Sequence, residues 1–588
     1  MTAATTMQRM RLLTCSMLIS VASLSVAHAQ DAAPAAAPSE SSMVNLVRQL
    51  VKQGVLKKDA GDALMAQAEA EAVQARAAAP TQTANAALPD AAPGAIRVPY
   101  IPETVRNQIR DEIRTEVLAQ AKTEGWASPG QTAPEWTKRI SLFGDFRFRS
   151  QSDLYSKANS PFIFDFARIN AAGPFPITTA LSIPYVNSTV DRVNRLRIRG
   201  RIGLKAELGG GVSVVTAVAT GNDNSPISFN QTLGGGLAKR NIWLDQAYLR
   251  LAPSDLFKAS FGRFPNPFVS TDLLFDDDVR FDGVAAEFNG GQFISDDFKL
   301  AIRGGAFPLD FNSGDFPNTQ QVKRKAPVKY LYSGQITVGA AIMDNVEVSA
   351  SAAYHSFQGV QGQFSEPCVL YLGATECSTD SFRAFSLRKG NTVFGLRNIV
   401  INPDATRALP ADQNQLLGLA FDYDILDINA SVRVPISEKT FVTVSGNYLR
   451  NLSFKRTDIC RYGVAGEPFN NGGAGGTTLC ATVNPRAFAG GPSGYQAKAS
   501  IGYDDVAARG QWNAQLGYRY VESDAVLDSL TDSNFHLGGT NAKGYFVGGK
   551  YGIFDKVTIG GRWLSANQIS GLEPLAIDVL QIDLEAKF

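Results

Sequence analysis

The sequence has few of the features that mark soluble enzymes or helical membrane proteins. Of its 588 residues only 19% are charged, and only 3 are histidines. After the N-terminus there is no uncharged apolar run of roughly 18 residues or more, which argues against transmembrane helices. The formal net charge of +1 gives no indication of a nucleic-acid partner.

Motifs for catalysis and cofactor binding are also missing. The chain contains no phosphate loop, zinc motif or EF-hand loop. Hydrolysis by a nucleophile needs a neighbouring base, and only His355 and His536 remain once an export signal is removed. We therefore expect no enzymatic activity, no cofactor and no metal site.

The first residues, 1–29, have the pattern of an export signal. Arg9 and Arg11 precede a short apolar stretch at 12–26, and the small residues Ala27–Ala29 form a cleavage site. The apolar stretch is too short for a membrane anchor. The mature protein is therefore predicted to leave the cytoplasm.

Residues 30–138 form a predicted periplasmic helical segment. Ala/Pro-rich linkers at 30–40 and 79–95 separate two amphipathic helical runs, 42–78 and 102–127. These helices could pack on their own protein, form a short coiled coil that joins subunits, or tether the protein to the cell wall. The sequence leaves the three alternatives open.

Residues 195–208 alternate between charged and aliphatic side chains. A period of two places successive side chains on opposite faces of a strand. Four arginines within seven residues, at Arg195, Arg197, Arg199 and Arg201, suit a barrel wall with water inside and lipid outside. This segment therefore points to a transmembrane strand.

The same alternation recurs from residue 139 to the C-terminus. Short and long connections alternate between the segments, as in outer-membrane barrels whose two ends are periplasmic. The sequence therefore predicts an all-β transmembrane barrel of about 16 antiparallel strands over 139–588. The predicted strands are 139–151, 192–208, 212–221, 241–252, 257–264, 281–289, 297–307, 330–342, 346–355, 424–434, 440–450, 494–504, 510–522, 541–551, 556–565 and 576–588.

Four cysteines remain after signal cleavage: Cys368, Cys377, Cys460 and Cys480. An exported protein meets an oxidising compartment, which favours disulfides. Three pairings are possible, and the two local ones, within each loop segment, fit best. A zinc site is the alternative, but the close paired spacing that it usually shows is absent.

The last strand, 580–588, alternates up to a terminal aromatic residue, Phe588. This ending resembles the assembly signal of bacterial outer-membrane proteins. The resemblance implies recognition by the barrel assembly machinery and insertion into outer-membrane lipid.

The chain also resembles the putative porin family of Gram-negative bacteria. The similarity is densest at 195–197, 244–249, 262–268 and 271–278. It implies passive diffusion of small hydrophilic solutes or ions across the bacterial outer membrane. Homotrimers are usual among porins with sixteen strands, so a homotrimer is expected by analogy.

The strand parities add a local prediction about the channel. By analogy with general porins, the third long connection is expected to fold inward and narrow the channel, so that its acids face arginines of the wall. Alternatively, the arginines merely pair with lumenal acids such as Asp145 and Glu207, or they serve an anion- or phosphate-selective channel. The predicted basic wall comprises Arg147, Arg149, Arg195, Arg197, Arg199 and Arg201, and the predicted loop acids are Asp272, Asp276, Asp277 and Asp278.

Overall fold

The computed structural model describes residues 135–588 except 172, 177–182, 222–224, 296, 312–327, 344–345, 373–374, 401–413, 473–479, 481–487 and 572. The predicted export signal and nearly all of the predicted helical segment lie outside the described residues. A short helix, α5 (Glu135–Lys138), precedes the first strand. No helix within the described ranges is long and apolar enough to cross a bilayer.

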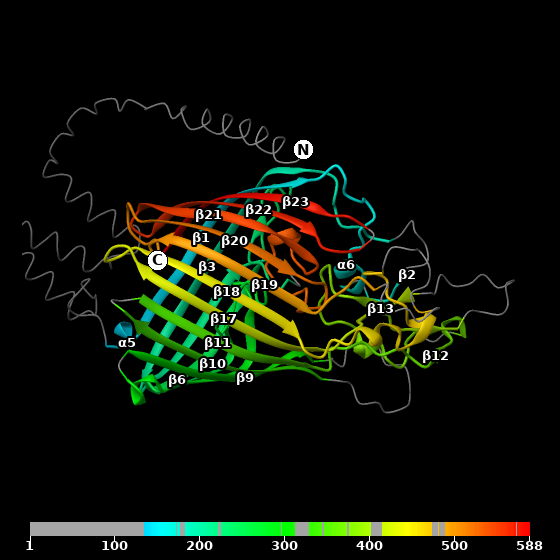
Figure 1. Ribbon diagram of the computed structural model, residues 1–588, viewed down its shortest axis with the longest axis horizontal. Helices are drawn as coiled ribbons and strands as arrows, with labels where there is room; N and C mark the ends of the chain where they lie inside the picture. Colours follow the sequence, from blue (N-terminus) through cyan, green and yellow to red (C-terminus); the bar gives the residue numbers. More distant parts are fainter. Residues whose placement is uncertain are drawn as a thin grey trace, which may run out of the picture. The chain divides into compact units, whose positions relative to one another are not determined.

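The fold is a closed barrel of sixteen antiparallel strands (Figure 1). Closure follows from the first strand, which pairs with both the second barrel strand and the last one. The barrel strands are β1 (Ile140–Tyr155), β3 (Arg192–Gly209), β4 (Val212–Thr220), β6 (Ile242–Ser254), β7 (Phe257–Pro265), β8 (Arg280–Asn289), β9 (Phe298–Asp310), β10 (Lys329–Ile342), β11 (Val346–Gln358), β17 (Tyr423–Pro435), β18 (Phe441–Asn451), β19 (Ser493–Gly502), β20 (Trp512–Val521), β21 (Ala542–Phe554), β22 (Val557–Gln568) and β23 (Ala576–Lys587).

All sixteen predicted strands are confirmed. The largest error in a boundary is four residues, at the end of β1, which was predicted at 151 and lies at Tyr155. One extra strand, β5 (Gln231–Thr232), was predicted as loop and pairs with β3. It is too short to have a periodic signal of its own.

The strands keep the predicted alternation between an apolar outer face and a more polar inner face. In β17, Ile428 and Val432 are exposed, whereas Asp427, of the other parity, is fully buried. Exposed aliphatic side chains on this scale are costly in water and are suited to lipid. The outer face is therefore the lipid-facing surface of an outer-membrane barrel.

Tight turns join the strands at one rim. Between β3 and β4, both Gly210 and Gly211 have positive φ, 61° and 79°. A Cβ atom on Gly211 would lie 2.1 Å from the carbonyl oxygen of Ala252. Glycine is therefore required here both by the backbone conformation and by the close approach of the next turn.

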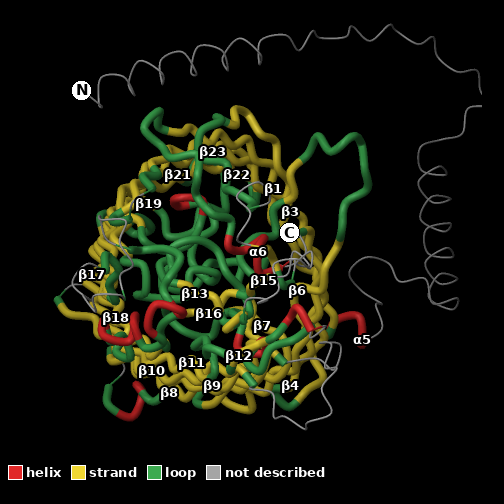
Figure 2. The backbone as a smooth tube through the Cα atoms, turned by 90° about the vertical axis from the view of Figure 1, so that its right-hand side faces the viewer, coloured by secondary structure: helices red, strands yellow, loops and turns green. Residues whose placement is uncertain are grey.

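Long loops connect the strands at the other rim, and several fold into the barrel. Figure 2 shows loop segments filling the inside of the ring of strands. Four of them matter for the site: L2 (221–241), L3 (266–279), L5 (359–422) and L7 (522–541). The loops also carry α6 (Phe166–Ala171), β2 (Phe175–Pro176), β12 (Pro367–Cys368), β13 (Val393–Gly395), β14 (Asn398–Ile399), β15 (Asn414–Gln415) and β16 (Leu417–Leu419).

The inserted loops form an apolar core with the inner face of the strands, which we call the loop core. Its side chains are almost completely removed from solvent; burying each one contributes about 1.5–3 kcal/mol. The loop core includes Leu273, Leu274 and Phe275 of L3, Val393, Leu417 and Leu419 of L5, Ala525, Val526, Leu527 and Leu530 of L7, and Leu331, Phe357, Tyr423, Ile425, Leu449 and Phe546 of the strands.

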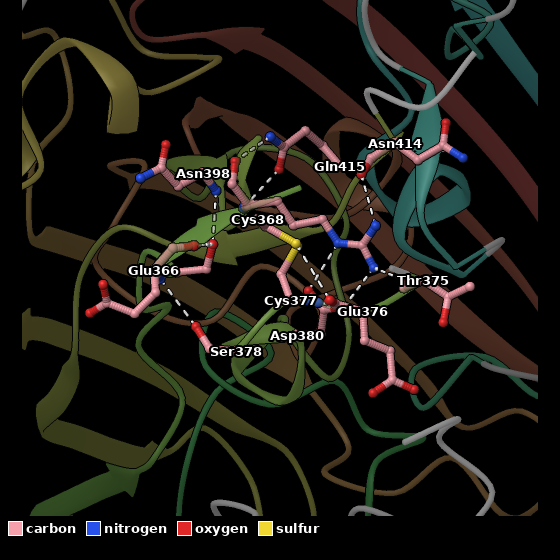
Figure 3. Close-up of a disulfide and its surroundings, with 12 residues drawn as sticks. Glu366, Cys368, Thr375, Glu376, Cys377, Ser378, Asp380, Asn398, Asn414 and Gln415 are labelled. Atoms are coloured by element: carbon pink, nitrogen blue, oxygen red, sulfur yellow. Dashed lines mark hydrogen bonds and ion pairs between the residues drawn. A yellow bond between two sulfur atoms is a disulfide. The ribbon is translucent and has the colours of Figure 1, made fainter. Parts of the chain in front are cut away.

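Both predicted local disulfides are confirmed. Cys368 pairs with Cys377 in L5, and Cys460 pairs with Cys480 in the following long loop, 452–492. Figure 3 shows the first disulfide and the surrounding side chains. Beside it Asp380 accepts two hydrogen bonds from the buried guanidinium of Arg397, at 2.6 and 2.9 Å, which fixes this part of L5.

Candidate functional site in the barrel lumen

The six arginines of the predicted basic wall lie side by side on β1 and β3. The strand register places Arg147 opposite Arg199 and Arg149 opposite Arg197. Like charges in directly opposed positions repel one another, so this arrangement requires compensation from other elements. Arg195 and Arg201 extend the row toward the two ends of β3.

Acids on neighbouring strands supply much of this compensation. Asp145 on β1 pairs with both Arg199 and Arg201, at 2.8 and 2.6 Å. Arg195 pairs with Asp153 at 2.9 Å. Glu207, the other predicted partner, pairs with Lys205 at 2.6 Å and has no ion pair to the basic wall among the described residues.

The last strand, β23, adds two more acids. Arg149 makes two hydrogen bonds to Asp583, at 2.6 and 2.7 Å, and Arg147 lies 3.6 Å from Glu585. Because β23 pairs with β1 only at barrel closure, these contacts join the two ends of the barrel. At the same junction Phe588, the predicted assembly signal, exchanges two backbone hydrogen bonds with Gly144.

Loop L3 lies against the basic wall through one of its four acids. Asp278 lies 3.6 Å from Arg199, and it accepts a hydrogen bond from the backbone of Phe229 in L2 at 3.2 Å. In L2, Asn230 also accepts a hydrogen bond from Arg147 at 2.6 Å. L2 and L3 are therefore both tied to the wall at this level.

Asp272, at the other end of L3, contacts a second group of arginines. It pairs with Arg519 of β20 and lies 3.7 Å from Arg562 of β22. Asp532 of L7 completes this group, at 2.7 Å from Arg519 and 3.1 Å from Arg562. L3 thus contacts arginines on two separate parts of the barrel wall.

The remaining two acids of L3 have other roles. Asp276 is buried and accepts a hydrogen bond from the backbone of Ser533 at 2.8 Å, and its own N–H bonds to Leu530 of L7. Burial, together with the nearby Asp278 and Asp532, raises its pKa well above the usual value. Burial, followed by repulsion from Asp272, also raises the pKa of Asp277.

The charge on Asp532 is held in place by its partners. Burial by itself would raise the pKa of this carboxyl, but the guanidiniums of Arg562 and Arg519 outweigh burial and hold the pKa well below its usual range. The two guanidiniums therefore favour the ionised form of Asp532. Two arginines and two acids, Asp532 and Asp272, make this second group close to electrically neutral.

Comparison with known families identifies the chain. The family model described as "Putative porin" matches residues 40–588, which is most of the sequence. The chain belongs to the putative porin family. It is an outer-membrane channel protein of Gram-negative type, and its sixteen-stranded barrel fits that assignment.

The chain is similar, at low identity, to several solved structures. OprB of Pseudomonas putida is 9% identical, with a TM-score of 0.40 over 78% of this chain and 97% of that chain. The channel DcaP of Acinetobacter baumannii is also 9% identical, with a TM-score of 0.35 over 76% and 97%. A loop-deletion mutant of OmpT of Vibrio cholerae is 10% identical, with a TM-score of 0.34 over 76% and 100%. Among curated proteins there is no match.

Several charged residues of the porin's interior were not predicted from the sequence. Arg562 lies on the inward parity of β22, so strand parity could have identified it, and Asp583 and Glu585 lie likewise on β23. Asp532 and Asn230 lie in loops, where no periodic signal exists. Their positions depend on contacts between segments far apart in the sequence.

The two histidines among the described residues make contacts that stabilise the fold. His355 is fully buried in β11, bonds to Ser333 at 2.8 Å, and lies between the rings of Phe268 and Phe275, each at 5.4 Å. His536 in L7 lies 2.6 Å from the amine of Lys389 in L5.

Proposed function

We propose that this porin lets small hydrophilic solutes and ions diffuse passively through a charged constriction bounded by L3, L7 and the basic wall. The observation that carries the proposal is the pair of contacts made by L3. Asp278 faces Arg199 on β3, while Asp272 faces Arg519 and Arg562 on the β20–β22 side.

Charges this close act on a passing ion because water screens them little. At physiological ionic strength the Debye length is about 8 Å. The nitrogen of Arg199 lies 3.6 Å from the carboxylate of Asp278, well within that length. An ion that passes beside such pairs experiences both signs of charge along its path, and ring-like arrangements of charge determine selectivity in other channels.

Planar-bilayer recordings of the purified protein test the constriction. We expect the double variant R197A/R199A to reduce the preference for anions, read from the reversal potential in a salt gradient. R433A is the matched control, because Arg433 lies at the turn-side end of β17 and pairs with Glu347 and Asp504. An unchanged reversal potential in R197A/R199A would contradict the proposal.

A strongly anion- or phosphate-selective channel is the second candidate. The basic wall favours it, but five of its six arginines have an acid within ion-pair distance among the described residues. The reversal potential of the wild-type protein separates the two candidates. Near-ideal anion selectivity would favour the second, and a weak preference would favour a general porin.

We also infer that the porin assembles as a homotrimer, on the basis of its uneven outer face. Exposed tyrosines mark the outer face of β11 and β18–β21: Tyr354, Tyr448, Tyr495, Tyr518 and Tyr545. On β7 and β8, by contrast, the strand parity turns an ion pair outward, Arg263–Asp282, with the two groups 2.9 Å apart.

Lipid-facing charges are costly at depth in the bilayer, whereas tyrosines are favoured at its interfaces. A second copy of the chain that covers β7 and β8 would remove the ion pair from lipid. Native mass spectrometry in detergent tests this arrangement. We expect trimers for the wild type and for Y495A, but destabilised trimers for R263A, whose partner acid would be left unpaired.

A further inference from the structure

Arg197 differs from the other five arginines of the basic wall. Each of those five has a carboxylate partner on β1 or β23. Within the described part of the chain, Arg197 has no such partner. Its hydrogen bond goes to a neutral group, from Nη1 to the amide oxygen of Gln151 at 2.9 Å, and its buried Nε–H has no acceptor.

The surroundings of Arg197 add positive charge. Arg149 lies directly across from it in the strand register, and Arg195 and Arg199 flank it on the same face of β3. On its other side the register partner is Thr232 of β5, which carries no charge. A guanidinium in this position lacks a paired negative charge, which an added anion would supply.

Amide side chains from separate elements border the same region. Gln581 of β23 donates to Asn534 of L7 at 2.8 Å and to Gln151 of β1 at 3.3 Å. Asn534 in turn accepts a hydrogen bond from Arg149 at 3.4 Å. Gln581 is fully buried, and its amide oxygen has no hydrogen-bond partner.

A third arginine brings another unused donor. Arg147 is more than nine-tenths buried, and its Nε–H has no acceptor among the described groups. Its Nη2 donates to Asn230 of L2 at 2.6 Å. The region thus combines uncompensated charge with two guanidinium N–H groups, on Arg147 and Arg197, that lack an acceptor and can donate to oxygen atoms.

We propose that Arg197 is the centre of a binding subsite for a singly charged oxyanion, a carboxylate or a monoanionic phosphate, on the path of permeating solutes. We take the ligand as singly charged because Arg197 is the one arginine of the basic wall without a carboxylate partner among the described residues. Planar guanidiniums bind both kinds of oxyanion through paired hydrogen bonds. The proposal rests on the proposed channel function, because it places the subsite in the lumen of that channel.

Isothermal titration calorimetry tests the subsite on the full-length protein in detergent. The probes are sodium acetate and inorganic phosphate buffered below its second pKa. We expect saturable binding of at least one of them by the wild type. In R197Q the affinity should fall about tenfold or more, because charge-assisted hydrogen bonds are lost.

The matched control is R433Q, which removes the same charge from an arginine outside the basic wall that is paired with Glu347 and Asp504. We expect R433Q to bind nearly as well as the wild type, and R197K to retain part of the affinity. Binding by acetate would identify a carboxylate subsite; binding by phosphate alone would identify a phosphate subsite. Equal losses in R433Q and R197Q, or no binding by the wild type, would overturn the proposal.

Bilayer conductance of the same preparation separates this proposal from the proposed function. A wild-type protein that conducts but binds neither anion would refute the subsite and leave the channel function intact. A protein that binds an anion but does not conduct would refute the channel function and leave the subsite as a binding site only.

Discussion

Two regions inside the same barrel are held together by different kinds of interaction. The basic wall of β1 and β3 places six arginines beside acids and amides, whereas the loop core packs Leu, Phe and Val side chains from L3, L5 and L7 against the opposing strands. Charged groups solvate an aqueous path, and apolar groups exclude water and fix the loops. L3 belongs to both regions, because Leu274 lies in the loop core and Asp278 contacts the wall.

In this porin, a buried apolar run holds loop L3 in place beside water. Asp272 and Asp278 bracket the apolar run Leu273–Phe275, so the burial of that run orients the acids on either side of it. A polar loop without this anchor would have no reason to stay in the lumen. The loop core therefore positions the carboxylates of Asp272 and Asp278.

The largest effect is expected from damage to the loop core. Phe357 of β11 is fully buried in it, and the change F357A should lower the free energy of unfolding by about 3–5 kcal/mol. Thermal unfolding in detergent measures this loss. The outward-facing V444A serves as control and should cost much less. Equal losses in both variants would mean that the loop core does not stabilise the barrel.

Removal of the disulfide in loop 452–492 should have the next largest effect. The variant C460S/C480S opens a loop that spans 20 positions and should lose about 2–4 kcal/mol. Thermal unfolding with and without reductant measures the change. The reductant should destabilise the wild type more than this variant. Any loss of stability that the reductant still causes in the variant would come from the Cys368–Cys377 disulfide.

A substitution at the basic wall should change ion selectivity more than it changes the stability of the protein. The variant D145N leaves Arg199 and Arg201 without their shared acid. We expect the reversal potential to shift toward anion preference, with a loss of stability of about 1–3 kcal/mol from the unpaired charges. A shift toward cations would contradict the assignment of the wall to the conducting path.

A pH effect is expected where L5 meets L7. The pKa of Lys389 is lowered from 10.5 to about 7, chiefly because the amine is buried; Asp528 opposes this shift, and Arg388 adds to it. In the unfolded chain the amine keeps its proton up to its ordinary pKa, so the unfolded state binds more protons between pH 7 and 10.5. Stability should therefore rise with pH across that window, and the cost of burying the charged amine should be complete below pH 7.

The variant K389M tests this dependence by removing the titrating group. Unfolding measured at several pH values should show a weaker rise in K389M than in the wild type. His536, which contacts Lys389, stays neutral in this window because burial and then Lys389 lower its pKa, so it does not obscure the result. An identical slope in the two proteins would contradict the prediction.

The sequence predicted the barrel well because each strand carries its own signal. In β17 the alternation of Ile428 and Val432 with Asp427 is visible from a few neighbouring residues. The basic wall was predicted for the same reason. The partners of the loop acids were not, since the contact of Asp272 with Arg519 joins positions 247 residues apart and has no local trace. The lack of an acid partner for Arg197 among the described residues likewise depends on the register of β1 with β3 and with β23.

The pairing of β1 with β23 also constrains the order of assembly. The contact of Arg149 with Asp583 joins residues 434 positions apart, and the loop core needs strands from both ends of the barrel. Such long-range contacts form late, because the intervening chain must first be ordered. The loop core and the ion pairs between β1 and β23 can therefore form completely only after the final strand has paired with the first. If assembly stopped before Phe588 paired with Gly144, the inner faces of the strands would remain exposed to the periplasm.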